Sequence, residues 1–255
     1  MDTSEWINYQ SQFDLSSLYF QDIPEKTNKH CVIIEPREHD KLVIVIKNFM
    51  YLLQKKGWGL IIFHSSDNEN MLKEGLKDWH NVIMVNYFDG NITIKQYNQM
   101  LLSPVFWKQL LSLGCHNCLI FQLDTVLLKD NIDDFIEYDY VGAPWGPKFQ
   151  HNVLELEIGN GGLSLRNVSK MLYITERYPI GEKFIHEDVY FSFYLKHTNG
   201  NLPSLEKAKS FSVETIYYPD TCGMHKPYMS EFPSHEAFAE LLAKRHYIYR
   251  ETQLI

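Results

Sequence analysis

The sequence predicts an α/β fold, in which a single domain is built around a mainly parallel central sheet flanked by helices. Two observations predict it. Short apolar runs rich in β-branched residues alternate with longer segments that carry helix caps, which is the pattern of strand–helix–strand crossover units. The 255 residues, 45% of them apolar, are also numerous enough to bury one large core.

The first predicted unit comprises two strands and the helix between them. Residues 31–36 ("CVIIEP") indicate a buried strand that a proline stops, and residues 58–66 ("WGLIIFHSS") indicate another. Residues 40–56 are expected to form the connecting helix, with Asp40 as its N-cap and Gly57 after its C-terminus. The apolar beginning of this segment also fits a strand, because short apolar runs do not distinguish the two.

The remaining elements alternate regularly to the middle of the chain and less regularly after it. Breakers, caps and apolar periodicity identify them. In order, we expect a helix at 67–77, a strand at 82–85, a helix at 104–113 stopped by Gly114, a strand ending at Gln122, loops at 142–150 and 159–162, a helix at 167–178, a helix beginning near Glu187 and a strand at 211–216.

Three parts of the chain are expected to differ in character. Residues 1–30 are polar and mixed and are read as an N-terminal arm. Residues 31–230 carry the alternating elements of the domain, and residues 231–255 are expected to be a helical extension packed on it.

Charge and composition exclude several classes of protein. The net charge of −8 and the absence of a long basic run argue against binding to nucleic acid or to an anionic membrane surface. The N-terminus does not have the pattern of a signal peptide, and no apolar run reaches the roughly 18 residues of a membrane span. We therefore expect a soluble, cytoplasmic protein. The CxxC at residues 115–118 is read as a turn entering a strand, because no second ligand pair follows.

Polar residues follow three of the predicted strands at the edge where parallel sheets bind ligands. Glu35 and Arg37 follow the first strand, His64 and Ser65 end the second, and Asp124 follows the strand that ends at Gln122. An acid at such a position can hold Mg²⁺ or Mn²⁺ together with ligand phosphates. The alternative for Asp124 is an acid that only caps a turn.

Three later segments carry further candidates. The loop before "LSLR" contains Gly161 and Gly162, which permit close approach of backbone to a ligand, although a tight turn between strands has the same composition. "HEDVYF" places Glu187 and Asp188 at the start of a helix, where the dipole favours the ionised state of a general base. Their alternative is a pair of capping acids. "GMHKP" offers a histidine and a lysine in a loop.

Taken in order, these segments resemble glycosyltransferases of the GT-A fold. They are most similar to a poorly characterised family of GT-A-like domains found in microbes, protists and large DNA viruses. The resemblance covers roughly residues 31–230. It is carried by "IIEPR", "FHS", "FQLDTVLL", "DYVGAPW", "GNGGLSLR", "HEDVYF", "FSVE" and "GMHKP". It implies a Rossmann-like domain that uses a nucleotide-sugar donor with Mn²⁺ or Mg²⁺.

The resemblance assigns metal ligands. Asp124 matches the last acid of the Asp-x-Asp motif of this fold, and His225 matches a histidine near the C-terminus that completes the metal shell. Gln122 stands where the first acid of that motif would be, and an amide is a weaker ligand than a carboxylate, so we expect weaker metal binding than at a site with both acids. Lys226 would help to neutralise the departing diphosphate.

The resemblance also assigns the chemistry. Asp188 matches the general base of inverting members, and Glu187 would orient the acceptor. Arg166 would brace the glycine loop or meet phosphate, and Trp145 would form a wall of the sugar pocket. The four polar residues that follow the first two strands would lie at the base or ribose end of the nucleotide.

The expected function is therefore transfer of a sugar from a nucleotide-diphosphate donor to a hydroxyl of a carbohydrate or glycan acceptor, with inversion. A UDP-sugar is the expected donor at the level of the family. Two alternatives stay open: a sugar-phosphate nucleotidyltransferase-like enzyme, and a non-catalytic domain that binds carbohydrate or nucleotide-sugar.

Overall fold

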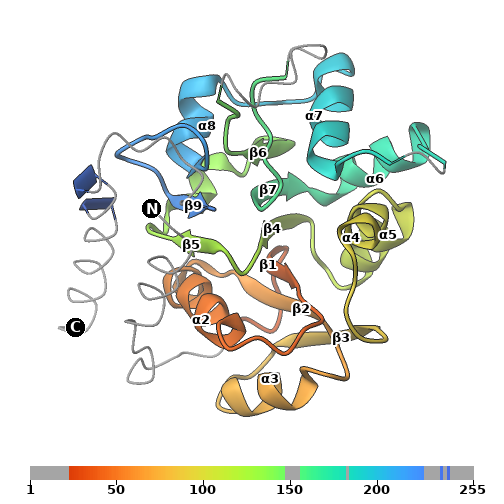
Figure 1. The fold of residues 1–255 in the computed structure, drawn as a ribbon, viewed down its shortest axis with the longest axis vertical. Coiled ribbons are helices and arrows are strands. Elements are labelled where there is room, and N and C mark those ends of the chain that lie inside the picture. The colour runs from red at the N-terminus through yellow and green to blue at the C-terminus, as the bar shows by residue number, and fades with distance from the viewer. Residues whose placement is uncertain (1–22, 147–155, 182–183, 227–235, 238–239, 242–255) are drawn as a thin grey trace.

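A computed structural model describes residues 23–146, 156–181, 184–226, 236–237 and 240–241. Six strands form a central sheet in the order β3-β2-β1-β4-β7-β6, and helices lie on both sides of it (Figure 1). Strands β3, β2, β1 and β4 are parallel, whereas β7 runs antiparallel to both β4 and β6. The predicted α/β fold with a mainly parallel sheet is confirmed.

The bounds of the elements are as follows. The central strands are β1 Lys29–Ile34, β2 Gly59–Ser65, β3 Ile83–Phe88, β4 Asn117–Phe121, β6 Tyr140–Gly142 and β7 Leu163–Asn167. The helices are α2 Leu42–Leu53, α3 Glu69–Gly75, α4 Ile94–Leu101, α5 Pro104–Ser112, α6 Val168–Arg177, α7 Glu187–His197 and α8 Leu205–Phe211. Two short 3₁₀ helices are η1 Gln54–Lys56 and η2 Asn131–Phe135. A second sheet consists of β5 Thr125–Leu127, β9 Gly223–His225 and β8 Ser212–Val213.

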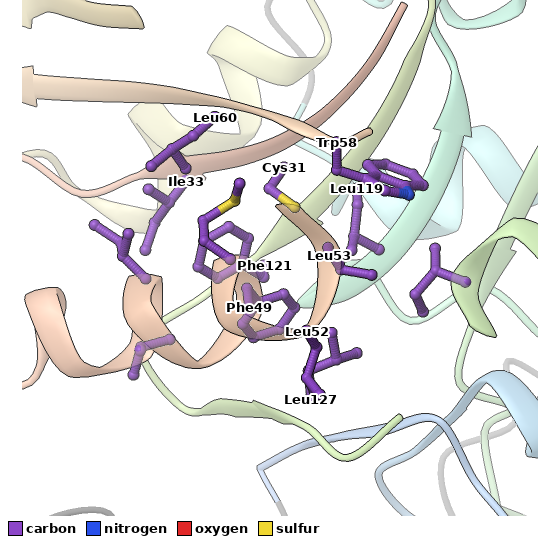
Figure 2. Packing of buried hydrophobic residues seen from close by; sticks show 14 of the residues in the cluster. Cys31, Ile33, Phe49, Leu52, Leu53, Trp58, Leu60, Leu119, Phe121 and Leu127 are labelled. Carbon is purple, nitrogen blue, oxygen red and sulfur yellow. The ribbon is translucent and has the colours of Figure 1, made fainter. Parts of the chain in front are cut away.

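Side chains of the central strands point alternately to the two faces of the sheet and pack into two hydrophobic cores, one on each face. In β1, Cys31 and Ile33 point to the side of α2 and α3, whereas Val32 points to the side of α4 to α7. Figure 2 shows the first core, where Phe49 of α2 stacks on Phe121 of β4 with ring centroids 4.1 Å apart. Both faces are buried, which is why the strands read as unbroken apolar runs.

The segment that fitted either a helix or a strand is the helix α2. Its buried residues Leu42, Val45, Ile46 and Phe49 recur at helical spacing, so a helix buries all of them against the sheet at once. α2 ends at Leu53, and the 3₁₀ helix η1 continues it to Lys56, where Gly57 ends the helical segment with a φ of 78°. The predicted cap is wrong: Lys41 occupies the N-cap position, and no side-chain cap hydrogen bond is present.

Most other predicted elements are confirmed, but two helices, α4 and α8, and the strands β5, β6 and β9 were not predicted. The loop expected at His225 is wrong, because His225 is the last residue of β9. The unpredicted α4 begins with a reciprocal capping box between Thr93 and Gln96. The helix α8 precedes β8, so the strand expected at 211–216 shrinks to two residues, Ser212 and Val213.

The two predicted ends of the chain lie largely outside the described residues, which include only 23–30 of the arm and 236–237 and 240–241 of the extension. Within the described ranges, no helix combines the length and the apolar character needed to cross a bilayer.

Candidate active site

A cleft of about 600 Å³ opens at the carboxyl ends of β1 and β4 and at the beginning of the antiparallel β7. Segments far apart in the sequence line it. They are residues 34–37, 91–94, 122–124, 160–162, 186–188 and 225–226, together with His39, Lys41, Tyr97 and Asn98. This is the edge at which parallel sheets bind ligands.

Asp124 and His225 meet in this cleft because the second sheet places their strands side by side. Thr125 of β5 pairs with His225 of β9, and the backbone N–H of Lys226 donates to the carbonyl of Asp124 at 3.0 Å. The Nε2 atom of His225 lies 3.3 Å from Oδ1 of Asp124. On the other side of the ring, Nδ1 lies 3.1 Å from Oε1 of Glu214. These are ion-pair distances, although neither ring nitrogen meets the geometry of a hydrogen bond.

The two carboxylates control the charge of this imidazole. Burial by itself would lower the pKa of His225, but Asp124 and Glu214 outweigh it and raise the pKa to about 9. Burial would likewise raise the pKa of Asp124, but the imidazolium and then the ammonium of Lys226 overcome it and lower that pKa. Asp124 is therefore ionised and His225 is protonated at neutral pH, so a cation that binds both residues would displace the proton on Nε2 of His225.

The residues present suit a divalent cation shared with a ligand rather than one held by protein alone. The described ranges contain no group of three or more His, Cys, Asp or Glu side chains arranged around one point as a metal cage. Asp124 and Nε2 of His225 supply two atoms that can bind a cation. Among the described residues, Nε2 is a buried nitrogen that has no hydrogen-bond partner. Hard cations commonly bind one or two protein groups and take their other oxygens from substrate phosphates. Gln122 also lines the cleft.

Asp188 lines the same cleft and is held by two backbone donors. Its Oδ1 accepts from the N–H of Val189 at 2.8 Å, and its Oδ2 accepts from the N–H of Gly161 at 3.3 Å. Burial, followed by the charge of Glu187, raises the pKa of Asp188 to about 6. A carboxylate with this pKa is mostly ionised at neutral pH and is a stronger base than an ordinary aspartate.

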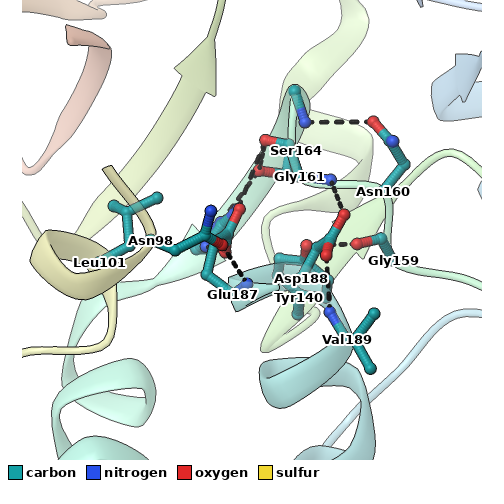
Figure 3. A network of polar contacts seen from close by, with 12 residues as sticks. Asn98, Leu101, Tyr140, Gly159, Asn160, Gly161, Ser164, Glu187, Asp188 and Val189 are labelled. Atoms are coloured by element: carbon teal, nitrogen blue, oxygen red, sulfur yellow. Dashed lines mark hydrogen bonds and ion pairs between the residues drawn. The ribbon is translucent and has the colours of Figure 1, made fainter. Parts of the chain in front are cut away.

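Glu187 is engaged within the protein. It forms a bidentate ion pair with Arg166, with Nη1–Oε2 2.5 Å and Nη2–Oε1 2.9 Å apart. Arg166 is fully buried and also donates to Ser164 Oγ at 2.9 Å. Figure 3 shows this network below the glycine loop, with Asn98 of α4 accepting from the backbone N–H of Glu187 at 2.6 Å. The network fixes the start of α7, and with it the position of Asp188.

The glycines of the loop make room for two neighbouring side chains. A Cβ atom at Gly161 would lie 2.1 Å from Oε1 of Glu187, and one at Gly162 would lie 2.1 Å from Nε2 of His225. Real Cβ atoms do not lie this close to another atom, so a side chain at Gly161 would displace Glu187 and one at Gly162 would displace His225. Both residues also line the cleft, where their backbone is open to a ligand.

The structure brings together most, but not all, of the residues expected at the site. Those that line the cleft are Glu35, Arg37, Gln122, Asp124, Gly161, Gly162, Glu187, Asp188, His225 and Lys226. Within this set Glu35 and Arg37 pair with each other, with Nε–Oε1 and Nη2–Oε2 both 2.7 Å apart.

Four expected residues do not line the cleft. Trp145 is 6% exposed and packs with Leu156 and with Val189 of α7, so its side chain lies in a small apolar cluster. Arg166 lies beneath the loop, as the bracing alternative required. His64 and Ser65 are buried, since β2 lies one strand away from the opening.

His64 and Ser65 are the last residues of β2 and, with the turn that follows them, hold the loop after β1. The Ser65 hydroxyl donates to the carbonyl of Pro36 at 2.6 Å, and Nδ1 of His64 lies 2.8 Å from the carbonyl of Ser65. Asn68, which follows this turn, donates through Nδ2 to the carbonyl of Glu35 at 2.7 Å. The two residues therefore support the cleft from behind instead of forming its surface.

Sequence reasoning missed Glu214 and the residues that α4 contributes. Glu214 lies directly after β8 and has no local signature that separates it from any other acid. The cleft residues Tyr97 and Asn98 follow from α4, and the Thr93-x-x-Gln96 capping box was the available signal for that helix.

Several solved structures share part of the course of this chain. The PaToxG glycosyltransferase aligns with a TM-score of 0.41 and 13% identity over 76% of this chain and 75% of its own. The 4-diphosphocytidyl-2C-methyl-D-erythritol synthase of Anaerococcus prevotii aligns with a TM-score of 0.46 and 10% identity over 87% and 99%. Residues 1–349 of S. aureus TarS align with a TM-score of 0.43 and 13% identity over 65% of this chain and 55% of that one. Likeness at this level carries no argument about activity.

A comparison with curated proteins gave no match. The family described as protein of unknown function (DUF5672) matches residues 82–226. That range is more than half of the 255 residues and includes every described cleft segment except those that follow β1. The chain therefore belongs to the DUF5672 family.

Proposed function

We propose that the protein is a glycosyltransferase that moves a sugar from a nucleotide-diphosphate donor, with UDP as the expected nucleotide, to a hydroxyl of a carbohydrate or glycan acceptor. The observation that carries the proposal is the composition of one cleft. It contains Asp188, a carboxylate whose pKa is raised to about 6, together with Asp124, His225 and Lys226. Sugar transfer needs both a base for the acceptor and positive charge for the leaving diphosphate.

The leaving-group side of the reaction is assigned to Asp124, His225 and Lys226. Asp124 and His225 would hold Mn²⁺ or Mg²⁺, which when bound supplies Lewis-acid stabilisation to the diphosphate oxygens. Lys226 lines the same end of the cleft and adds a point charge. Its backbone adopts a φ of 43°, an uncommon conformation for a residue other than glycine, and strain of this kind is concentrated at functional sites.

The acceptor side is assigned to Asp188. The two backbone donors at Gly161 and Val189 hold its carboxylate in place. Asp188 takes the proton of the acceptor hydroxyl while the hydroxyl oxygen attacks the anomeric carbon and the bond to the diphosphate breaks. One displacement of this kind inverts the anomeric configuration. Glu187, whose carboxylate is paired with Arg166, is a positioning residue in this scheme.

The test is a screen of nucleotide-sugars with Mn²⁺ or Mg²⁺, in which release of nucleoside diphosphate is measured with water or a mixture of saccharides as acceptor. Wild type is expected to release nucleoside diphosphate from at least one donor, and a chelator is expected to stop the release. The variants Asp124→Ala and Asp188→Asn should lose most of the rate, whereas Glu206→Gln, which alters an exposed acid of α8, should keep it. Full turnover by Asp188→Asn would refute the assigned base. In a parallel assay with a nucleoside triphosphate and a sugar 1-phosphate, release of pyrophosphate would identify a nucleotidyltransferase instead.

A further inference from the structure

Glu214 is a buried acid on the side of His225 that faces away from Asp124. It is 7% exposed and does not line the cleft. Its Oε1 lies 3.1 Å from Nδ1 of His225, and its Oε2 accepts a hydrogen bond of 2.8 Å from Nδ2 of Asn160. A buried carboxylate is costly unless polar partners surround it, and these two contacts supply them. Glu214 therefore contacts both His225 and the glycine loop.

The two ring nitrogens of His225 contact different carboxylates, because Nδ1 lies beside Glu214 and Nε2 lies beside Asp124. Without a cation both nitrogens carry a hydrogen, because the pKa of His225 is raised to about 9, and a bound cation has to displace one of these hydrogens. The neutral imidazole that results carries one N–H donor and one lone pair, and the partner of one nitrogen determines the role of the other. A carboxylate such as Glu214 can only accept, so it favours the hydrogen on Nδ1. The lone pair then lies on Nε2, the atom that is 3.3 Å from Oδ1 of Asp124.

We propose that Glu214 is a positioning residue that fixes the Nδ1–H tautomer of His225 and so makes Nε2 the atom that binds the divalent cation beside Asp124. This inference rests on the proposed function, because it concerns the metal assigned there. Carboxylates that orient a ligating histidine in this manner commonly change metal affinity by roughly 10- to 100-fold when they are replaced.

The second contact of Glu214 extends its effect to the glycine loop. Oδ1 of Asn160 accepts from the backbone N–H of Gly162 at 3.1 Å. Gly162 lies so close to the His225 ring that a side chain at this position would overlap with the ring. One carboxylate therefore holds the ring from the side of Nδ1 and, through Asn160, holds the backbone that packs against Nε2.

The test is the binding of Mn²⁺ in the presence of UDP, measured by electron paramagnetic resonance, with thermal denaturation of the same samples. Glu214→Gln keeps the size of the side chain but cannot accept from both His225 and Asn160, so we expect Mn²⁺ affinity to fall at least about tenfold. Glu206→Gln, an exposed acid of the preceding helix, should bind Mn²⁺ as wild type does. His225→Ala is expected to abolish the binding.

The outcomes separate this inference from the proposed function. If His225→Ala loses Mn²⁺ while a folded Glu214→Gln binds it as tightly as wild type, the role of Glu214 is refuted and the metal site stands. If wild type does not bind Mn²⁺ even in the presence of UDP, both fall. If Glu214→Gln does not fold, nitrogen-15 NMR of wild type with saturating Mg²⁺ decides, because the inference requires a proton on Nδ1 of His225 and none on Nε2, and the opposite tautomer would overturn it.

Discussion

Replacing Asp188 by Asn is expected to inactivate the protein and to stabilise its fold at neutral pH. The pKa of Asp188 lies near 6 instead of its ordinary 3.8 because burial and then Glu187 disfavour the charge. At about 1.36 kcal/mol per pH unit, the difference between these two pKa values corresponds to a loss of about 3 kcal/mol in the free energy of unfolding when Asp188 is ionised. This value is an upper bound, because the side chain is partly exposed and water screens its charge. Asn keeps one acceptor oxygen of two, which costs about 1 kcal/mol. The net gain is about 1–2 kcal/mol.

The gain has a characteristic dependence on pH. A carboxyl group whose pKa is raised by folding contributes stability below its unfolded pKa and loses that contribution as pH rises through the folded pKa. Asp188→Asn should therefore be about 1 kcal/mol less stable than wild type below pH 3.8, gain stability relative to wild type up to about pH 6 and keep a constant advantage above it.

Chemical denaturation across this pH range, in the presence of a chelator, measures the effect, and thermal denaturation should show a rise of about 3–6 °C at neutral pH. Asp78→Asn is the matched control, because Asp78 is an exposed acid far along the chain from the cleft. A variant that is less stable than wild type at every pH would refute the assignment of Asp188 as a carboxylate kept in an unfavourable environment.

Three further outcomes are expected. The rate constant kcat/KM should fall about tenfold per pH unit below about pH 6 as the proposed base is protonated, and a flat profile would argue against that base. Arg166→Met should lower the free energy of unfolding in urea by roughly 3–5 kcal/mol, because Glu187 stays buried without its partner. The double variant Arg166→Met, Glu187→Leu should recover most of this free energy. An equal loss in the single and the double variant would contradict a charge effect. Gly162→Ala should weaken Mn²⁺ binding about tenfold or more by displacing His225, measured against Gly146→Ala, whose added carbon meets nothing closer than 3.3 Å.

The order of elements was predictable because each local signal agreed with the global fold. The buried strands have no polar alternation, and the helix α5 has a proline at its start and Gly114 after its end. The two short helices α4 and α8 were not predicted, because their sequences are not strongly apolar and their helical conformation depends on tertiary packing. The wrong N-cap of α2 arose because a favourable residue type, Asp40, stands one position too early.

The candidate site was predictable only where strand ends determine position. Asp124, Asp188 and His225 line one cleft because they lie at the ends of adjacent elements. Whether a side chain at such an end faces the opening or the core depends on the pleat and on neighbouring strands, which spacing does not reveal. Trp145 and His64 faced inward for this reason. Glu214 acts through a contact across two strands of a small sheet, so no local pattern predicts it.

The antiparallel course of β7 has a consequence for how ligands affect the whole molecule. Phe121, the last residue of β4, pairs with Leu163, the first residue of β7, so the turn after one strand and the loop before the other open on the same side. The binding surface is thus assembled from both halves of the chain and exists only when the sheet is complete. Any small molecule that occupies it should raise the melting temperature of the entire domain, which makes a thermal-shift screen a route to its natural ligand.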